Sequence, residues 1–308
     1  MVMNILSMRC FVFAVVMATC QTLLAQIPGI GPVAEIQKLH AGFGFTEGPA
    51  EDADGNIFFT DIPNARIHQI ATNGELTIFQ ENSGHANGLM VDSQGNLVKC
   101  EMDGQISRVS IRTKTQTTLA PGYNGHRFNA CNDLVIDRQG GIYFTDPHFR
   151  APEPLPQSVT AVYYLASDGK VTRLIDNLKA PNGVILSPDE KTLYVVPSGQ
   201  SEVMAYAVQS PGKIDEGKVL VSLKQPDGVT GSGGDGLTVD EKGNLYVTSQ
   251  LGVQVISPAG EILGVIEFPE QPANVTFVGT DRKTLFVTAR TSVYIAPMEV
   301  SGHRFATE

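Results

Sequence analysis

The sequence contains no tryptophan, and charged residues make up only 18% of its 308 positions. Together with 42% hydrophobic residues, this low charge excludes a globally disordered chain. No run of lysine and arginine occurs and the formal net charge is −10, so we expect no nucleic-acid partner. Glycine and proline, by contrast, are frequent, at 31 and 18 residues. This composition is typical of many short strands joined by tight turns.

A long hydrophobic run is also absent near the N-terminus. The apolar stretch from Cys10 to Ala18 is too short to span a bilayer, and it follows the basic residue Arg9. A small residue, Ala25, lies a few positions further on. These features predict a secretory signal peptide over residues 1–25, and therefore an exported protein, periplasmic or extracellular, with no stable membrane insertion. Residues 26–308 are expected to form a single domain.

Cysteine is scarce, and two of the four cysteines lie in the predicted signal peptide. Cys100 and Cys131 remain, which are too few for a disulfide framework. They form either one bridge or two buried thiols. The sequence also lacks HExxH and the paired cysteines of a zinc site, and it has no GxSxG nucleophile elbow.

One phrase recurs six times along the rest of the chain, with starts spaced 40, 45, 50, 53 and 39 residues apart. The first copy reads Glu47-Gly-Pro-Ala-Glu-Asp-Ala-Asp-Gly-Asn-Ile-Phe-Phe-Thr-Asp61. It predicts a strand, a tight turn at Asp-Gly-Asn and a second strand, and two more short strands fit before the next copy. The pattern predicts an all-β fold, a six-bladed β-propeller with four antiparallel strands per blade.

The two ends of the repeat array predict how the ring closes. After the last copy there is room for only three strands, of which the third is Ser292 to Pro297. Residues 33–41 are strand-like and precede the first copy. We expect this N-terminal strand to pair beside Ser292–Pro297 and complete the last blade, which would leave no open sheet edge.

The first strand of each propeller blade lines the central channel, so the residue before it sits at one mouth. All six such residues carry a side-chain oxygen: Glu47, Asn87, Asn132, Asn182, Asp235 and Asn274. The second strand returns to the same mouth and ends at these positions: Asp61, Glu101, Asp146 and Ser249. We therefore expect up to five carboxylates at one mouth, with a bound cation offsetting their repulsion. Oxygen donors of this kind suit Ca²⁺ or Mg²⁺ better than Zn²⁺.

Turn chemistry is the alternative explanation of the same residues. Asn87, Asn182 and Asp235 each precede a glycine, and Asn-Gly and Asp-Gly are common turn dipeptides. That explanation does not account for Glu47, because glutamate has no turn preference. Two insertions, residues 122–128 and 147–156, are expected on the same face as walls around a ligand.

Five segments resemble the senescence-marker-protein/gluconolactonase/luciferin-regenerating-enzyme family. They are Phe45-Thr-Glu-Gly-Pro49, Arg127-Phe-Asn-Ala-Cys-Asn-Asp133, Tyr143-Phe-Thr-Asp-Pro147, Ala180-Pro-Asn-Gly183 and Asp235-Gly236. The resemblance implies one catalytic divalent metal ion at the channel mouth. Glu47, Asn182 and Asp235 match the family's ligand positions, and Asn132 matches a fourth that binds metal or substrate.

The resemblance is to gluconolactonases and implies a metal-dependent lactonase acting on sugar-acid lactones such as gluconolactone, and the predicted signal peptide makes it a secreted one. Ca²⁺ is the expected cofactor, with Mg²⁺, Mn²⁺ and Zn²⁺ as alternatives. Asp235 is expected to be both a metal ligand and the catalytic proton acceptor. Four residues are expected to contact the substrate: Asn132, Arg127, Asp146 and His148.

Two other functions stay open at this point. A phosphotriesterase-like hydrolase would bind a phosphoryl oxygen at the same mouth. A non-catalytic propeller would bind a protein or glycan, but it has no need of Glu47, Asn182 and Asp235 together at one mouth. The sequence predicts neither the particular lactone nor the oligomeric state.

Overall fold

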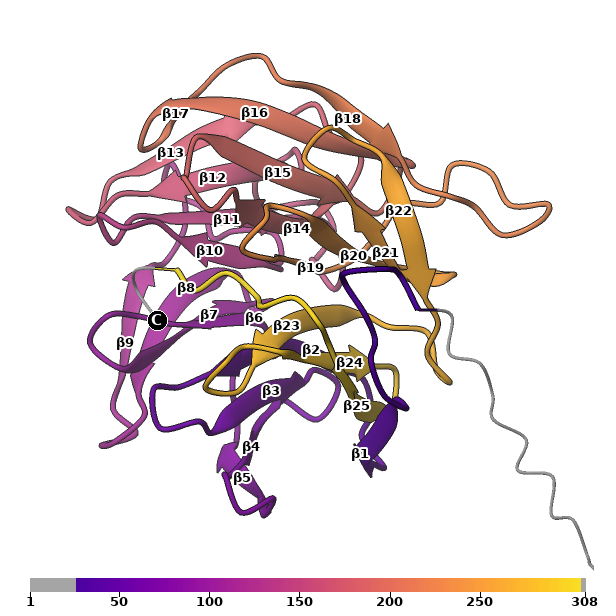
Figure 1. Cartoon of the computed structure of the whole chain (residues 1–308). Coiled ribbons are helices and arrows are strands. Elements are labelled where there is room, and N and C mark those ends of the chain that lie inside the picture. The colour runs from indigo at the N-terminus through magenta and orange to yellow at the C-terminus, as the bar shows by residue number, and fades with distance from the viewer. Residues whose placement is uncertain (1–25, 306–308) are drawn as a thin grey trace, which may run out of the picture.

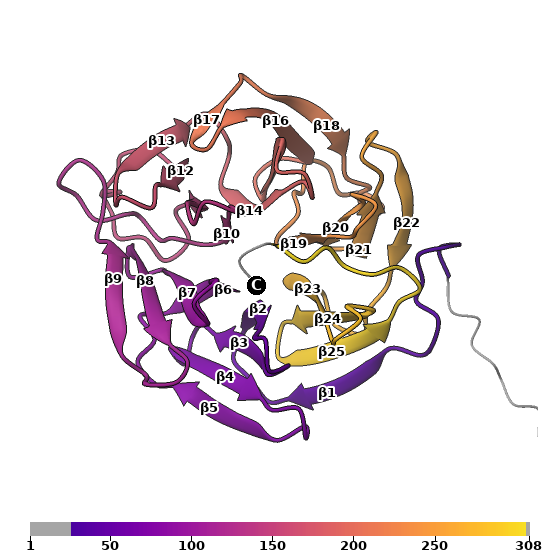
Figure 2. The same cartoon turned by 60° about the vertical axis from the view of Figure 1, so that its left-hand side comes forward.

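The structure is a computed structural model that describes residues 26–305, so the predicted signal peptide lies outside the described residues. This part of the chain forms 25 strands in six sheets, which stand around a central axis (Figure 1; Figure 2). The predicted all-β, six-bladed propeller is confirmed. No helix within residues 26–305 is long and apolar enough to cross a membrane.

The first three blades each hold four strands in chain order, from the channel outward. Blade one comprises β2 (Thr46–Glu51), β3 (Ile57–Asp61), β4 (Arg66–Ile70) and β5 (Leu76–Gln80). Blade two comprises β6 (Ala86–Val91), β7 (Asn96–Glu101), β8 (Gln105–Ser110) and β9 (Gln116–Ala120). Blade three comprises β10 (Leu134–Ile136), β11 (Ile142–Asp146), β12 (Ala161–Leu165) and β13 (Val171–Ile175).

Blade four carries one additional short strand on its outer side, and blade six borrows a strand from the N-terminal side. Blade four comprises β14 (Pro181–Leu186), β15 (Thr192–Pro197), β16 (Glu202–Ser210), β17 (Lys213–Ile214) and β18 (Lys218–Ser222). Blade five comprises β19 (Leu237–Val239), β20 (Leu245–Ser249), β21 (Gly252–Ile256) and β22 (Ile262–Ile266). Blade six comprises β23 (Asn274–Val278), β24 (Thr284–Ala289), β25 (Ser292–Pro297) and β1 (Gln37–Ala41).

Closure occurs as the sequence predicts. Strand β1 pairs antiparallel with β25, with Gln37 opposite Ile295 and Ala41 opposite Ser292. This pairing joins the beginning of the described chain to the last blade and removes the open edge that blade six would otherwise present.

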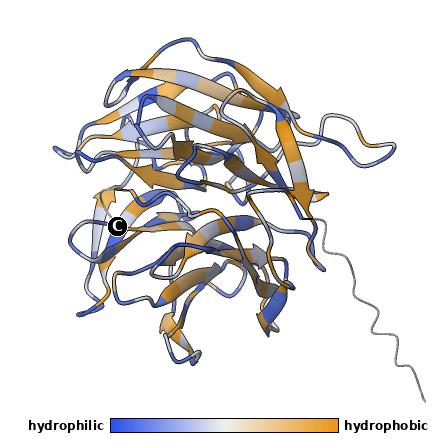
Figure 3. Ribbon diagram, in the orientation of Figure 1, coloured by the Kyte–Doolittle hydropathy of each residue, from blue (hydrophilic) through white to orange (hydrophobic). Residues whose placement is uncertain are grey.

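Burial follows the distance of each strand from the axis. The inner strands β6 and β14 are buried at every position, because both faces of each blade pack against neighbouring blades. The outer strands β5 and β9 are only partly buried. In Figure 3 hydrophobic residues lie mainly along the strands, and hydrophilic residues are frequent in the connecting loops.

Buried threonines on the second strands connect adjacent blades. The hydroxyl of Thr145 donates to the carbonyl of Asn182 at 2.6 Å, which joins blade three to blade four. Thr60 bonds in the same way to the carbonyl of Asn87, and Thr248 to that of Ala273. These hydrogen bonds keep the beginnings of neighbouring inner strands at the same level along the channel axis.

The glycines after the mouth residues are required by close packing between blades, not by turns. A methyl group on Gly183 would overlap the carbonyl oxygen of Asp235, and one on Gly236 would overlap the side chain of Asn274. Neither glycine has a positive φ, so conformational freedom is not what selects them. Gly48 meets the carbonyl of Asn87 in the same way and also has a φ of 46°. The turn explanation of the Asn-Gly and Asp-Gly pairs is therefore wrong.

The far end of the channel is covered by the C-terminal segment. Residues after β25 run across the centre of the ring, where His303 donates its main-chain N–H to Val239 (Figure 2). Phe305 is buried there and lines a small void of about 50 Å³ together with Arg282. A small molecule can therefore approach the channel from the mouth that carries the oxygen ligands.

The packing role of these glycines predicts the effect of Gly183→Ala. Overpacking against Asp235 and Leu237 should destabilise the fold by about 1–3 kcal/mol, measured by urea unfolding. The control is Gly95→Asn, because Gly95 has nothing within 4 Å and a φ of 73° that asparagine tolerates. Equal stability of the two variants would contradict the close-packing explanation.

Candidate functional site

A cavity of about 500 Å³ opens at the predicted mouth. Five of the six mouth residues line it together: Glu47, Asn87, Asn132, Asn182 and Asp235. They come from five different blades, each within two residues of the start of an inner strand. The geometry therefore brings all four predicted metal-binding residues to one floor.

The sixth mouth residue, Asn274, supports this floor without lining the cavity. Its amide nitrogen donates to Oε2 of Glu47 at 2.9 Å, and its amide oxygen accepts the main-chain N–H of Val275. The same Oε2 also accepts the N–H of Gly48 at 2.8 Å. Both contacts fix the carboxylate of Glu47 through one oxygen, which leaves Oε1 to contact a ligand.

Asn182 is oriented by comparable contacts. Its amide nitrogen donates to Oγ of Ser198 at 2.9 Å, and the amide also bonds to the carboxylate of Asp235. Ser198 in turn donates to the carbonyl of Gly234 at 2.9 Å. Because the nitrogen of Asn182 makes these bonds, its side-chain oxygen is the atom available to a cation.

The floor concentrates negative charge away from water. Burial, followed by repulsion from Asp235, raises the pKa of Glu47 well above its usual range. Burial also raises the pKa of Asp235, while the hydrogen bond from Asn182 and the charge of Arg290 act in the opposite direction. Beneath them Asp133 is buried, and burial raises its pKa to about 7. The positive charges and hydrogen-bond donors of the protein therefore do not fully compensate the negative charge of these carboxylates.

A divalent cation fits this set of donors. Two carboxylates and two amide oxygens are hard ligands that suit Ca²⁺ or Mg²⁺, and the cation's charge would favour the ionised carboxylates. Within residues 26–305 no three His, Cys, Asp or Glu side chains converge as a metal cluster. The amides of Asn132 and Asn182 would therefore have to complete the coordination.

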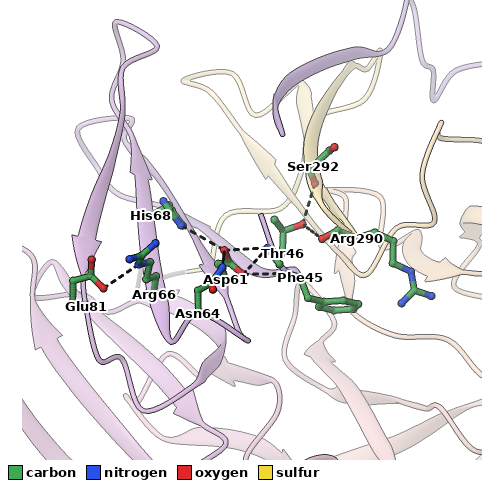
Figure 4. Close-up of polar contacts among 10 residues, drawn as sticks. Phe45, Thr46, Asp61, Asn64, Arg66, His68, Glu81, Arg290 and Ser292 are labelled. Carbon is green, nitrogen blue, oxygen red and sulfur yellow. Dashed lines mark hydrogen bonds and ion pairs between the residues drawn. The ribbon is translucent and has the colours of Figure 1, made fainter. Parts of the chain in front are cut away.

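The residues that end the second strands do not line this cavity, contrary to expectation. The carboxylate of Asp61 accepts the main-chain N–H groups of Gly44 and Phe45, at 3.0 and 3.1 Å, and the amide of Asn64 at 2.7 Å (Figure 4). The neighbouring Thr60 bonds across to blade two, and successive side chains of a strand point to opposite faces. Asp61 therefore binds the loop that leads into its own blade.

Asp146, predicted to contact substrate, has the corresponding position in blade three. Its two carboxylate oxygens accept the N–H groups of Asn129 and Ala130, at 2.9 and 2.8 Å, and its side chain is fully buried. Glu101 is bound within blade two by the ammonium of Lys99, at 3.0 Å. Of the five carboxylates expected at the mouth, only Glu47 and Asp235 line the cavity.

Two other predicted substrate contacts also lie elsewhere. The guanidinium of Arg127 donates to the carbonyls of Phe128, Met102 and Asn129, at 3.0–3.1 Å, so it stabilises its own loop. His148 is exposed and packs beside the ring of Phe149. The insertion 147–156 does form a wall, but through Phe149 and Arg150, while residues 122–128 contribute nothing to the lining.

The remaining wall residues share a position that the sequence analysis overlooked. Four of them are the first residue after the second strand of a blade: Ile62, Met102, Ser198 and Arg290. In the repeat, Ile62 and Met102 stand one residue beyond Asp61 and Glu101, the strand ends that were expected at the mouth. The repeat therefore did point to these wall positions, but one residue further along a strand whose side chains alternate between its two faces.

The two remaining cysteines are buried free thiols. Cys100 lies on β7 and Cys131 directly precedes Asn132. Burial raises the pKa of both thiols well above the usual range, so both stay protonated at neutral pH.

The raised carboxyl pKa values predict how stability depends on pH. An acid whose pKa is higher in the folded than in the unfolded state loses stability as pH rises between the two values. With EDTA present, the free energy of unfolding should therefore fall less between pH 5.5 and pH 8 in Asp235→Asn than in the wild type, measured by urea unfolding. Comparing the variant with the wild type separates the contribution of Asp235 from those of His68 and His303. The lowered pKa values of these histidines make stability rise, not fall, as pH increases. An equal or larger fall in the variant would contradict the charge assignment.

Comparison with known proteins agrees with the fold. Residues 45–291 match the family described as SMP-30/Gluconolactonase/LRE-like region. A gluconolactonase from Zymomonas mobilis is 29% identical over 283 residues, covering 84% of this chain and 80% of that protein. The solved structure of a gluconolactonase from Xanthomonas campestris is 33% identical with a TM-score of 0.78, covering 86% and 89% of the two chains.

A calcium-binding protein, regucalcin from Agrobacterium tumefaciens, shares the fold at 21% identity, with a TM-score of 0.74 and coverage of 87% and 95%. The family match includes every residue of the cavity floor, from Glu47 to Asp235. The chain belongs to the SMP-30/gluconolactonase/LRE-like family.

Proposed function

We propose that this protein is a secreted, divalent-metal-dependent lactonase, which opens a cyclic ester with water. The observation that carries the proposal is the convergence of Glu47, Asn132, Asn182 and Asp235 on the floor of one cavity. The gluconolactonases among its relatives support a lactone as the substrate and make gluconolactone the first compound to assay.

Glu47, Asn132, Asn182 and Asp235 are the residues that would hold the cation. When bound there, a divalent ion supplies a Lewis acid for the lactone carbonyl. The donors are oriented beforehand, since Asn274 holds Glu47 and Ser198 holds Asn182. Ca²⁺ is the metal we propose, because it accepts carboxylate and amide oxygens in flexible geometry.

Asp235 is the proposed proton acceptor. It is partly exposed to the cavity, whereas Glu47 is buried at 3% exposure and bound by two donors. Asp235 takes a proton from the water that attacks the lactone carbon. The ring carbon–oxygen bond then breaks, and Asp235 returns the proton to the departing oxygen, so that a hydroxy acid is formed.

The proposal predicts distinct effects of two substitutions at the floor. Asp235→Asn should reduce lactone turnover by roughly 10²–10⁴-fold even at saturating Ca²⁺, because a general base is lost. Asn182→Ala should weaken metal binding and recover activity in excess Ca²⁺. Acid release from gluconolactone and other lactones, with EDTA and metal add-back, measures both.

Asp227→Asn is the matched control for this assay, because Asp227 is exposed and does not line the cavity. Near-full activity of Asp235→Asn at saturating metal would contradict the proton-acceptor role. If EDTA leaves wild-type turnover unchanged, the metal requirement is wrong. Hydrolysis of phosphotriesters but of no lactone would favour the phosphotriesterase-like alternative.

Export is the remaining part of the proposal and depends on residues 1–25. The basic residue Arg9, the short apolar run and Ala25 support it. We expect N-terminal sequencing of the protein recovered from the exported fraction to begin near Gln26. Recovery only from the cytoplasm, with Met1 retained, would contradict export.

A further inference from the structure

The cavity walls above the polar floor are largely apolar. Five side chains make up this part of the lining: Phe45, Ile62, Pro63, Met102 and Phe149. They come from blade one, from the first residue after β7 and from the loop after β11. A ligand bound to the floor must therefore place its remaining surface against hydrocarbon and aromatic groups.

Arg290 is a positively charged residue of this wall, and neighbouring residues hold its side chain in place. Its guanidinium lies 5.3 Å from the ring centroid of Phe45, and Figure 4 shows both side chains. The guanidinium also donates to Oε1 of Gln271 at 2.5 Å. Its main-chain carbonyl accepts the N–H of Thr46 at 2.8 Å. Asp61 acts as a positioning residue, because it holds the main chain of Phe45. The guanidinium is thus placed beside the cavity before any ligand binds.

No carboxylate within the described residues forms an ion pair with Arg290 or with Arg150, the second arginine of the cavity. Other surface arginines do have such partners. Arg66 pairs with Glu81 at 3.0 Å, and Arg138 pairs with Glu190 at the same distance. The charge of Arg290 also acts on Asp235 across the cavity, but neither guanidinium group has an ion-pair partner among the described residues, so both can contact a ligand.

We propose that the lactone bound here has an apolar body and carries an anionic group, which Arg290 and Arg150 recognise. This inference rests on the proposed lactonase function and names its substrate class. An uncharged polyhydroxylated lactone would place hydroxyls against Phe45, Met102 and Phe149, where a buried polar group without a partner is unfavourable. An apolar body removes that penalty, and a carboxylate matches the fork of donors that arginine presents.

The test compares three lactones with the wild-type protein at saturating Ca²⁺. They are gluconolactone, a neutral alkyl δ-lactone and the same alkyl lactone ending in a carboxylate. The carboxylated lactone should have the highest kcat/KM, by about 10–100-fold over its neutral counterpart, as expected for a charge-assisted hydrogen bond. The gain should appear mainly in KM, because the arginine contact is the same before and during the reaction.

Arg290→Met should remove most of this advantage while lowering kcat/KM for the neutral alkyl lactone much less, and Arg290→Lys should retain part of it. Arg66→Met is the matched control, because Arg66 is an exposed arginine of blade one outside the cavity. Arg66→Met should leave kcat/KM unchanged for all three lactones.

The outcomes separate this inference from the proposed function. A preference for gluconolactone, or equal kcat/KM for the charged and neutral alkyl lactones, overturns the inference while lactonase activity stands. Hydrolysis of none of the three at any metal concentration overturns both. The comparison of substrates needs only the wild-type protein, so it holds even if Arg290→Met fails to fold.

Discussion

The close approach of the inner strands at one mouth of the channel is the constraint on which the rest of this structure depends. Where Asn182 and Asp235 begin neighbouring inner segments, the following glycine packs directly against the next blade and has no room for a side chain. Threonines of the second strands bind the backbone carbonyls at this level, with Thr145 donating to Asn182 and Thr248 donating to Gly236 and Ala273. Side chains separated by about fifty residues in sequence thereby reach one small floor.

That convergence has an electrostatic consequence. Glu47 and Asp235 are brought together in a region enclosed by protein, and burial raises the pKa of both. Asp133 adds a further buried carboxyl where blades one, two, four and five have glycine at the corresponding position. Such an arrangement is unfavourable without a counter-charge. It is consistent with a site whose stability and function are linked to a bound cation.

The repeat predicted which residues would meet, but not which way every side chain would face. Five of the six residues expected at the mouth line one cavity, because a shared position in a repeat implies a shared position in the ring. Asp61 and Asp146 were placed at the right end of their strands, yet they bind the preceding loops of their own blades. A single step along an alternating strand separates Asp61 from Ile62, which does line the cavity.

The sequence by itself determined the six blades, their closure by an N-terminal strand and the oxygen-rich floor, because hydrophobic alternation, turn residues and repeat spacing are local properties. Only the tertiary structure decided that Arg127 stabilises its own loop while Arg290 lines the cavity. Both are loop arginines next to a strand or an insertion, and nothing local distinguishes them. Their roles depend on which carbonyls, rings and amides the folded chain brings within reach of each guanidinium.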